Sequence, residues 1–202
     1  MKNLEQHLSE YAKYHRDQRN IYTHYVGIPL IVFSVFCLLS KPAFLVSAPI
    51  FGEMIISPAL FVWAIGNAFY IKLDIKLGIV MTLITGAMVY FAQPIAQNEV
   101  GTWLAISLGI FIGGWVLQFI GHHYEGKKPA FVDDIMGLAI GPLFVLAELS
   151  FELGLRSATR NALYSARGLR TRLPRLAAVR DRHTGQPAQR RARTGLGAGP
   201  GS

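Results

Sequence analysis

Four histidines border the apolar runs of this sequence and could bind a metal ion. His15 and His24 precede the first apolar run, and His122 and His123 follow the fourth. Neutral imidazole is the commonest protein ligand for transition metals, and polar groups at one end of a membrane bundle often mark its working site. Imidazoles with optional carboxylate oxygens favour Fe(II), Zn(II) or Mn(II) over Ca(II) or Cu(I).

The spacing of these histidines sets conditions on such a site. Asn20 and His24 are four residues apart and share one helical face, whereas His15 reaches them only if the chain bends. His122 and His123 point about 100° apart on a helix, so both bind one ion only where the helix unwinds. For His123, the roles of ligand and of mere neighbour therefore stay equally open.

Long uncharged runs predict an all-α integral membrane protein. Three of these runs hold 18, 22 and 21 residues, at 54–71, 77–98 and 100–120. Each can cross a hydrocarbon core of roughly 30 Å at about 1.5 Å per residue, and residues 21–40 supply a further span. Residues 135–147 form a possible fifth segment, which at 13 residues is short or re-entrant. We therefore predict a bundle of four spans plus this segment.

The two ends of the sequence have a different character. Residues 2–18 place Leu4, Leu8 and Tyr11 at helical spacing with charges between them, which predicts an N-terminal amphipathic helix. Residues 156–202 hold 11 arginines and one acid, are rich in Gly, Pro and Ala, and have no sustained apolar period. We expect a disordered tail there, without a nucleic-acid partner, after a membrane-embedded domain at 1–155.

The distribution of positive charge predicts the orientation in the membrane. Four crossings put the N-terminal segment, the turn at 72–76 and the residues after His122 on one side. The basic residues of that side are Lys2, Lys13, Arg16, Arg19, Lys72, Lys76, Lys127 and Lys128, whereas the other side has only Lys41. By the positive-inside rule the histidine side is cytoplasmic, in a bacterial inner membrane or in the endoplasmic reticulum of a eukaryote.

Two blocks of the sequence resemble a widespread family of small membrane proteins. The first block, residues 14–29, is YHRDQRNIYTHYVGIP, and the second, residues 114–122, is GWVLQFIGH and continues to Pro129 and Ala130. The family is typified by a yeast endoplasmic-reticulum 2-hydroxy fatty acid dioxygenase that acts in phytosphingosine breakdown. The resemblance covers about residues 1–155.

This resemblance implies an iron(II)-dependent dioxygenase that uses dioxygen to shorten a long-chain 2-hydroxy fatty acid by one carbon, among membrane lipid. The motif histidines of the family correspond here to His15, His24 and His122. The polar companions to which the resemblance assigns a part in catalysis are Asn20, Gln118 and Glu125. Lys127 and Lys128 could steer the substrate carboxylate. The sequence departs from the yeast pattern at His123, which leaves open whether this residue is a fourth ligand.

A non-catalytic function is the chief alternative to this dioxygenase. A membrane scaffold or lipid-binding protein would use the histidines only to order the helix ends. A bis-histidine haem protein and a zinc hydrolase are further alternatives. The first would show a Soret band, and the second would regain activity with zinc rather than iron.

Overall fold

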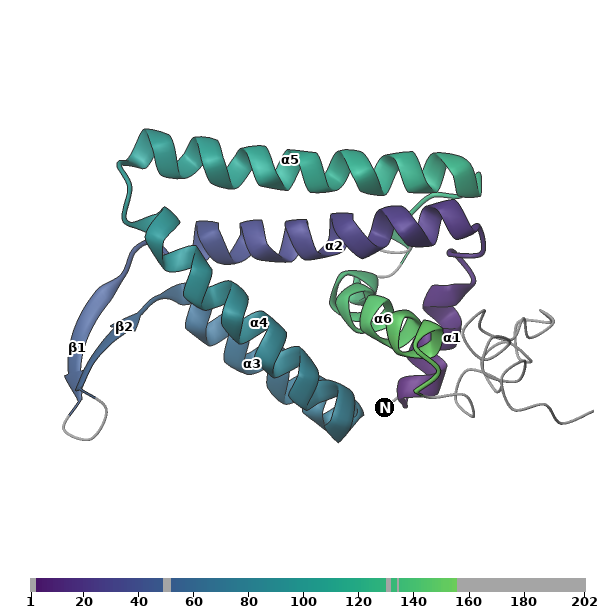
Figure 1. Cartoon of the computed structure of the whole chain (residues 1–202), viewed down its shortest axis with the longest axis horizontal. Helices are drawn as coiled ribbons and strands as arrows, with labels where there is room; N and C mark the ends of the chain where they lie inside the picture. Colours follow the sequence, from purple (N-terminus) through teal and green to yellow (C-terminus); the bar gives the residue numbers. More distant parts are fainter. Residues whose placement is uncertain (1–2, 49–51, 130–131, 134, 156–202) are drawn as a thin grey trace, which may run out of the picture.

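The computed structural model describes residues 3–48, 52–129, 132–133 and 135–155, and these are mostly helical (Figure 1). Their elements in chain order are α1 (Leu4–Ala12), α2 (Gln18–Leu39), β1 (Phe44–Ala48), β2 (Gly52–Ile56), α3 (Pro58–Leu73), α4 (Ile75–Ala96), α5 (Val100–Glu125) and α6 (Met136–Glu152). The tail at 156–202, which we expect to be disordered, lies outside the described residues.

Among the residues that the structure describes, three helices are long and apolar enough to cross a membrane: α2, α4 and α5. The second expected span differs, because its first residues form strand β2 instead. Pro58 then starts α3 at the first helical position, after Ser57 as N-cap. The resulting helix has 16 residues, hence a length of about 24 Å, shorter than a hydrocarbon core of roughly 30 Å. The apolar helices indicate a membrane protein, with three spanning candidates rather than the four predicted.

A β-hairpin replaces the loop that the all-α prediction put after the first span. Strands β1 and β2 pair antiparallel, with Phe44 opposite Ile56 and Ala48 opposite Gly52. Uncharged apolar residues suit a strand as well as a helix, so an uncharged run does not by itself distinguish the two. The hairpin lies at the end of the molecule away from α1 (Figure 1).

The N-terminal helix is shorter than expected and is followed by a bend. Asn3 and Gln6 form a capping box that starts α1, which ends at Ala12 rather than near residue 18. Leu8 and Tyr11 are buried against α6, together with Phe144. A turn at residues 13–17 then changes the direction of the chain before α2. This turn supplies the bend that His15 needs to approach His24.

Helix α6 runs from Met136 to Glu152 and is therefore longer than the segment predicted at 135–147. One side of it packs against α1 through Leu143, Phe144 and Phe151, all nearly inaccessible to solvent. The same apolar cluster includes Tyr70 at the end of α3 and Leu77 at the start of α4. The N-terminal helix and the residues on either side of the turn at 72–76 therefore pack into one apolar cluster.

Helices α2 and α5 lie side by side and antiparallel along their length (Figure 1). Glycines allow this close approach. A Cβ on Gly27 would lie 2.5 Å from Gln118 Nε2, and a Cβ on Gly114 would lie 2.7 Å from Ile31 Cγ1. Small residues are the usual means by which membrane helices bring their backbones close. The approach brings the polar residues of α2 opposite those of α5.

Candidate metal centre and its pocket

Three histidines from three segments converge at the α1 end of the bundle. His15 lies in the turn after α1, His24 on α2, and His122 in the last turn of α5. All three are buried, and one ligand nitrogen of each lies within 4.8 Å of the other two. The three nitrogens are close enough together that they could hold one shared ion.

The hydrogen bonds of His15 and His24 fix which nitrogens carry protons. His15 Nδ1 lies 2.9 Å from the Tyr11 carbonyl oxygen, and His24 Nδ1 lies 2.8 Å from the Asn20 carbonyl oxygen. A carbonyl only accepts, so each Nδ1 donates and each Nε2 of a neutral ring presents a lone pair. These two Nε2 atoms are 3.0 Å apart. Two facing lone pairs require a shared proton or a cation, and a carbonyl on the far nitrogen is typical of metal-ligating histidines.

His122 is the third histidine of the cluster, and it has a buried nitrogen, Nδ1, without a hydrogen-bond partner among the residues that the structure describes. An unpaired polar atom is unfavourable in an apolar interior, and a cation would satisfy it. The three histidines could therefore form a metal site, and three imidazoles suit a transition metal better than calcium or magnesium.

His123 lies outside this cluster. It is exposed, and its ring is 6.2 Å from that of Tyr124. Helix α5 remains helical through Glu125, so two consecutive side chains cannot both face His24. The structure thus brings together three of the four histidines that the sequence offered as ligands.

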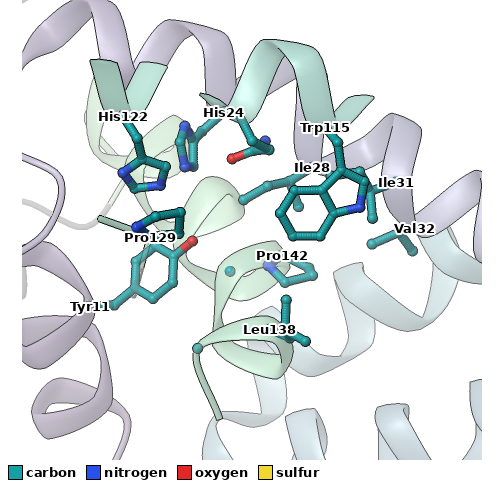
Figure 2. Close-up of a pocket in the computed structure, with 13 residues that line it drawn as sticks. Tyr11, His24, Ile28, Ile31, Val32, Trp115, His122, Pro129, Leu138 and Pro142 are labelled. Atoms are coloured by element: carbon teal, nitrogen blue, oxygen red, sulfur yellow. The ribbon is translucent and has the colours of Figure 1, made fainter. Parts of the chain in front are cut away.

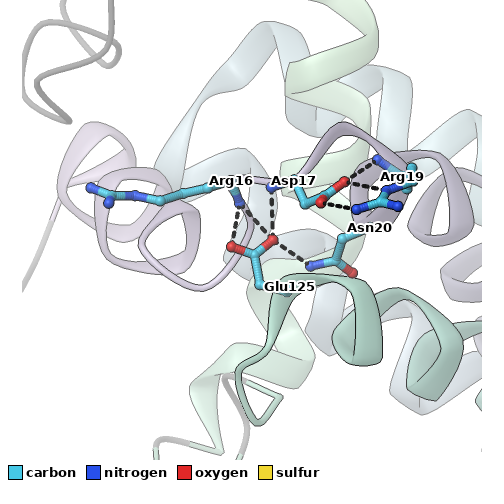
Figure 3. Close-up of polar contacts among 5 residues, drawn as sticks. All are labelled: Arg16, Asp17, Arg19, Asn20 and Glu125. Carbon is cyan, nitrogen blue, oxygen red and sulfur yellow. Dashed lines mark hydrogen bonds and ion pairs between the residues drawn. The ribbon is translucent and has the colours of Figure 1, made fainter.

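Glu125 holds the turn that carries His15 (Figure 3). Its carboxylate accepts hydrogen bonds from the backbone N–H of Arg16 at 2.9 and 3.0 Å and of Asp17 at 2.8 Å. Asn20 Nδ2 donates a further hydrogen bond of 3.1 Å to the same carboxylate. Gly126, with φ of 67°, ends α5 directly after Glu125. The carboxylate oxygens of Glu125 therefore accept hydrogen bonds mainly from the backbone of the turn that precedes α2.

Asn20 connects this carboxylate to the histidines. Its side chain donates to Glu125, and its carbonyl oxygen accepts the proton of His24 Nδ1. The residue is fully buried where α2 crosses α5, beside Gly121. Asn20 and His24 lie on one helical face, as expected. Asn20 contacts His24 through its backbone carbonyl, because its side chain points to Glu125.

Asp17 starts α2 as its N-cap. Its carboxylate accepts a hydrogen bond of 2.8 Å from Arg19 N and pairs with the Arg19 guanidinium at 2.8 Å. These hydrogen bonds lower the pKa of the Asp17 carboxyl. The cap remains charged near neutral pH, where a negative group stabilises a helix N-terminus.

A mostly apolar pocket of about 60 Å³ lies beside the histidines (Figure 2). Four polar side chains line it: His24, His122, Gln118 and Tyr11. Gln118 Nε2 is buried without a hydrogen-bond partner in the described part of the chain. The remaining lining is apolar and comes from α2, α5, α6 and Pro129. The pocket therefore places an amide donor beside the candidate metal site in a mostly apolar lining.

Tyr11 is a functional candidate that the sequence analysis treated only as part of the surface helix. Its ring stacks on His15 with centroids 4.2 Å apart, and its hydroxyl is turned toward the pocket (Figure 2). Gly141 makes room for this hydroxyl, since a Cβ there would lie 3.1 Å from it. Burial raises the pKa of Tyr11, so the hydroxyl stays protonated and can donate. The spacing of four residues between Tyr11 and His15 was the available signal.

Lys127 and Lys128 lie at the same end but do not line the pocket. Lys127 Nζ donates to the Lys13 carbonyl oxygen at 3.0 Å, and Lys128 pairs with Asp133. The hydrogen bond from Lys128 lowers the pKa of Asp133, and the Tyr14 hydroxyl adds a second one. Both lysines are exposed. Neither lysine is among the residues that line the pocket beside the histidines.

Comparison with known proteins identifies the family. The family model for 2-hydroxy-palmitic acid dioxygenase Mpo1-like proteins matches residues 1–153. The chain belongs to this family. The Mpo1-like segment includes all six described helices and all three clustered histidines.

A relative with a named activity supports an oxidoreductase. The Mpo1-like chain is 26% identical over 153 residues to the 2-hydroxy-palmitic acid dioxygenase MPO1 of Saccharomyces cerevisiae. The alignment covers 75% of this chain and 82% of the yeast protein. No solved structure matches the chain significantly.

Proposed function

We propose that this chain is an iron(II)-dependent dioxygenase that shortens long-chain 2-hydroxy fatty acids by one carbon. The observation that supports it best is the buried set of His15, His24 and His122, with two Nε2 atoms facing each other beside an apolar pocket. Family membership and the name of the yeast relative suggest the substrate class. One dioxygen would convert the hydroxy acid to the shortened acid, carbon dioxide and water, with no other reductant.

Bound iron(II) would supply the activation of dioxygen and a Lewis-acid site for the hydroxy acid. The three histidines would hold the ion, and the carbonyls of Tyr11 and Asn20 would keep the imidazoles oriented. Asn20 and Glu125 would position the turn and helix that carry two of these ligands. A role through the backbone suits their contacts better than direct contact with the substrate.

The pocket would orient the substrate head. Gln118 Nε2 and the Tyr11 hydroxyl are donors that a carboxylate and a 2-hydroxyl can both accept from. The apolar lining would exclude water and strengthen these hydrogen bonds. Lys127 and Lys128 would raise the local concentration of the anionic substrate from the interface. The basic residues around this end support a cytoplasmic orientation of the site.

The decisive experiment is an oxygen-uptake assay on detergent-purified protein loaded with iron under anaerobic conditions. With 2-hydroxypalmitic acid we expect equal uptake of dioxygen and release of carbon dioxide, together with a fatty acid one carbon shorter by mass spectrometry. Palmitic acid without the hydroxyl is the control substrate, and His122→Ala is the control protein. Stoichiometric iron without uptake would contradict the activity. Protein that binds no metal would favour the scaffold or lipid-binding alternative.

A further inference from the structure

We propose that the long acyl chain of the substrate lies in a second, larger cavity, and that Gly66 on α3 sets the chain length it accepts. We call this cavity the acyl groove. Its walls come from five helices, and its lining includes Val35, Phe36, Gly66, Asn67, Tyr70 and Phe111. The inference rests on the proposed function, because the occupant is the tail of the same 2-hydroxy acid.

The acyl groove adjoins the histidine pocket. The side chains that line both cavities are Ile31, Val32, Trp115, Leu138 and Pro142. Trp115 and the residues of α2 appear together around the pocket in Figure 2. The groove has a volume of about 340 Å³, against about 60 Å³ for the histidine pocket. The small cavity fits a head group, and only the larger one has room for a long chain.

The length of the two cavities suits a long acyl chain. Helix α2 lines both, from His24 beside the metal site to Phe36 in the groove. Twelve residues of helix correspond to about 18 Å at 1.5 Å per residue. A chain that starts at the histidines can therefore extend along about half of α2, which has 22 residues, before it leaves the groove.

Three polar side chains of the groove, those of Asn67, Thr85 and Tyr70, are already paired within the protein, whereas the indole N–H of Trp63 has no partner among the described residues. Asn67 Nδ2 donates to the Trp63 carbonyl oxygen at 2.8 Å and to Thr85 Oγ1 at 3.0 Å, and Thr82 Oγ1 donates to Asn67 Oδ1 at 3.1 Å. The Tyr70 hydroxyl donates to the Ala139 carbonyl oxygen at 2.9 Å. These three groups therefore need no polar partner from a ligand, and the groove is otherwise lined mainly by apolar and aromatic side chains. A hydrocarbon chain fits this lining because it brings no polar atom that would lose its hydrogen bonds with water.

Gly66 marks the place where the groove can be shortened. It lines the groove, and a Cβ built on it meets no atom within 4 Å. A larger side chain there would take up space in the groove without a clash at its Cβ. Gly113 on α5 is also open around a Cβ but lines neither the histidine pocket nor the acyl groove. Gly113→Leu is therefore a matched control for Gly66→Leu.

The test compares both variants on 2-hydroxypalmitic acid and on 2-hydroxyoctanoic acid. For Gly66→Leu we expect kcat/KM for the long acid to fall at least about tenfold, the scale of a steric mismatch in an apolar pocket, with the short acid within about twofold. Gly113→Leu should leave both values unchanged. An equal loss on both acids, with metal content and melting temperature retained, would overturn the assignment of Gly66.

A photolabelling arm tests the groove without catalysis. The probe is 2-hydroxypalmitic acid with a diazirine at its terminal carbon, bound to the full chain under anaerobic conditions, and the labelled residues are mapped by mass spectrometry. Labels within 62–70 of α3 support the groove, and Gly66→Leu should remove them. Labels spread over the exposed face of α5 would overturn it, whether or not turnover is seen. Labelling of α3 without any turnover would count against the proposed reaction alone.

Discussion

The Nε2 atoms of His15 and His24 face each other at 3.0 Å while each ring donates through Nδ1 to a backbone carbonyl. This relationship would orient two candidate ligands before an ion binds. It also leaves the site electrostatically unfavourable when empty and neutral, since lone pairs oppose each other in a buried place. Metal binding should therefore be coupled to the local fold of the turn at residues 13–17.

Metal content should separate the three clustered histidines from the fourth. His15→Ala, His24→Ala and His122→Ala should each reduce bound metal from near one per chain to background, because each removes a ligand. His123→Ala should retain the metal, since its side chain is exposed outside the cluster. Elemental analysis of anaerobically purified proteins measures this. Loss of metal in His123→Ala would show that α5 rearranges on binding.

Removing the metal should destabilise the protein. An ion present at 1,000 times its dissociation constant stabilises the folded state by about 4 kcal/mol. Chelation should therefore lower the melting temperature of the unaltered protein, and re-addition of iron(II) should restore it. His24→Ala, which lacks a ligand, should melt at the same temperature with and without chelator. A chelator-independent melting temperature in the unaltered protein would argue against a resident ion.

Glu125→Ala should weaken metal binding although Glu125 touches no histidine ring nitrogen in the structure. The substitution removes the acceptor for the N–H groups of Arg16 and Asp17 and so loosens the turn next to His15. Loss of a residue that orients a ligand typically lowers metal affinity 10- to 100-fold, and we expect a decrease of about that size. Competitive metal titration measures it. Glu99→Ala, at the other end of α5 and without a capping hydrogen bond, is the control and should bind normally.

Tyr11→Phe should impair turnover while retaining the metal. The phenylalanine ring preserves the stack on His15, and only the pocket-facing hydroxyl is lost. Loss of one hydrogen bond worth about 1.4 kcal/mol corresponds to about a tenfold decrease in kcat/KM. The exposed tyrosine on α2, in the variant Tyr22→Phe, is the control. Unchanged kcat/KM in Tyr11→Phe would remove the hydroxyl from the substrate site.

The sequence predicted the candidate site better than the lengths of the helices. The family motifs were sufficient to single out His15, His24 and His122, which the structure brings together. The parity argument depended on four crossings, and the structure has three spanning candidates among its described residues. The uncharged run at 54–71 was predicted to be one membrane span, but its first residues belong to strand β2 and the helix begins only at Pro58. Absence of charge does not distinguish a strand from a helix.

Side-chain direction was the part that the sequence could not supply. The family resemblance assigned Glu125 a part in catalysis, but its carboxylate turns to the backbone of residues 16 and 17. Tyr11 was assigned to a surface helix, because burial against α6 depends on a contact between segments far apart in the chain. Such contacts follow from packing, which local spacing does not encode.

Gly121→Ala should disturb the site through the crossing of α2 and α5. A Cβ at this position would overlap Thr23 Oγ1 and lie 2.5 Å from Asn20 Oδ1, so the helices must separate or Asn20 must move. Overpacking of this kind typically costs about 1–3 kcal/mol, and movement of Asn20 would also disturb the carbonyl that orients His24. We therefore expect both a lower melting temperature and weaker metal binding. Gly113→Ala, where a Cβ meets no atom within 4 Å, should change neither. A Gly121→Ala protein with normal metal affinity would show that the ligands are positioned independently of this crossing.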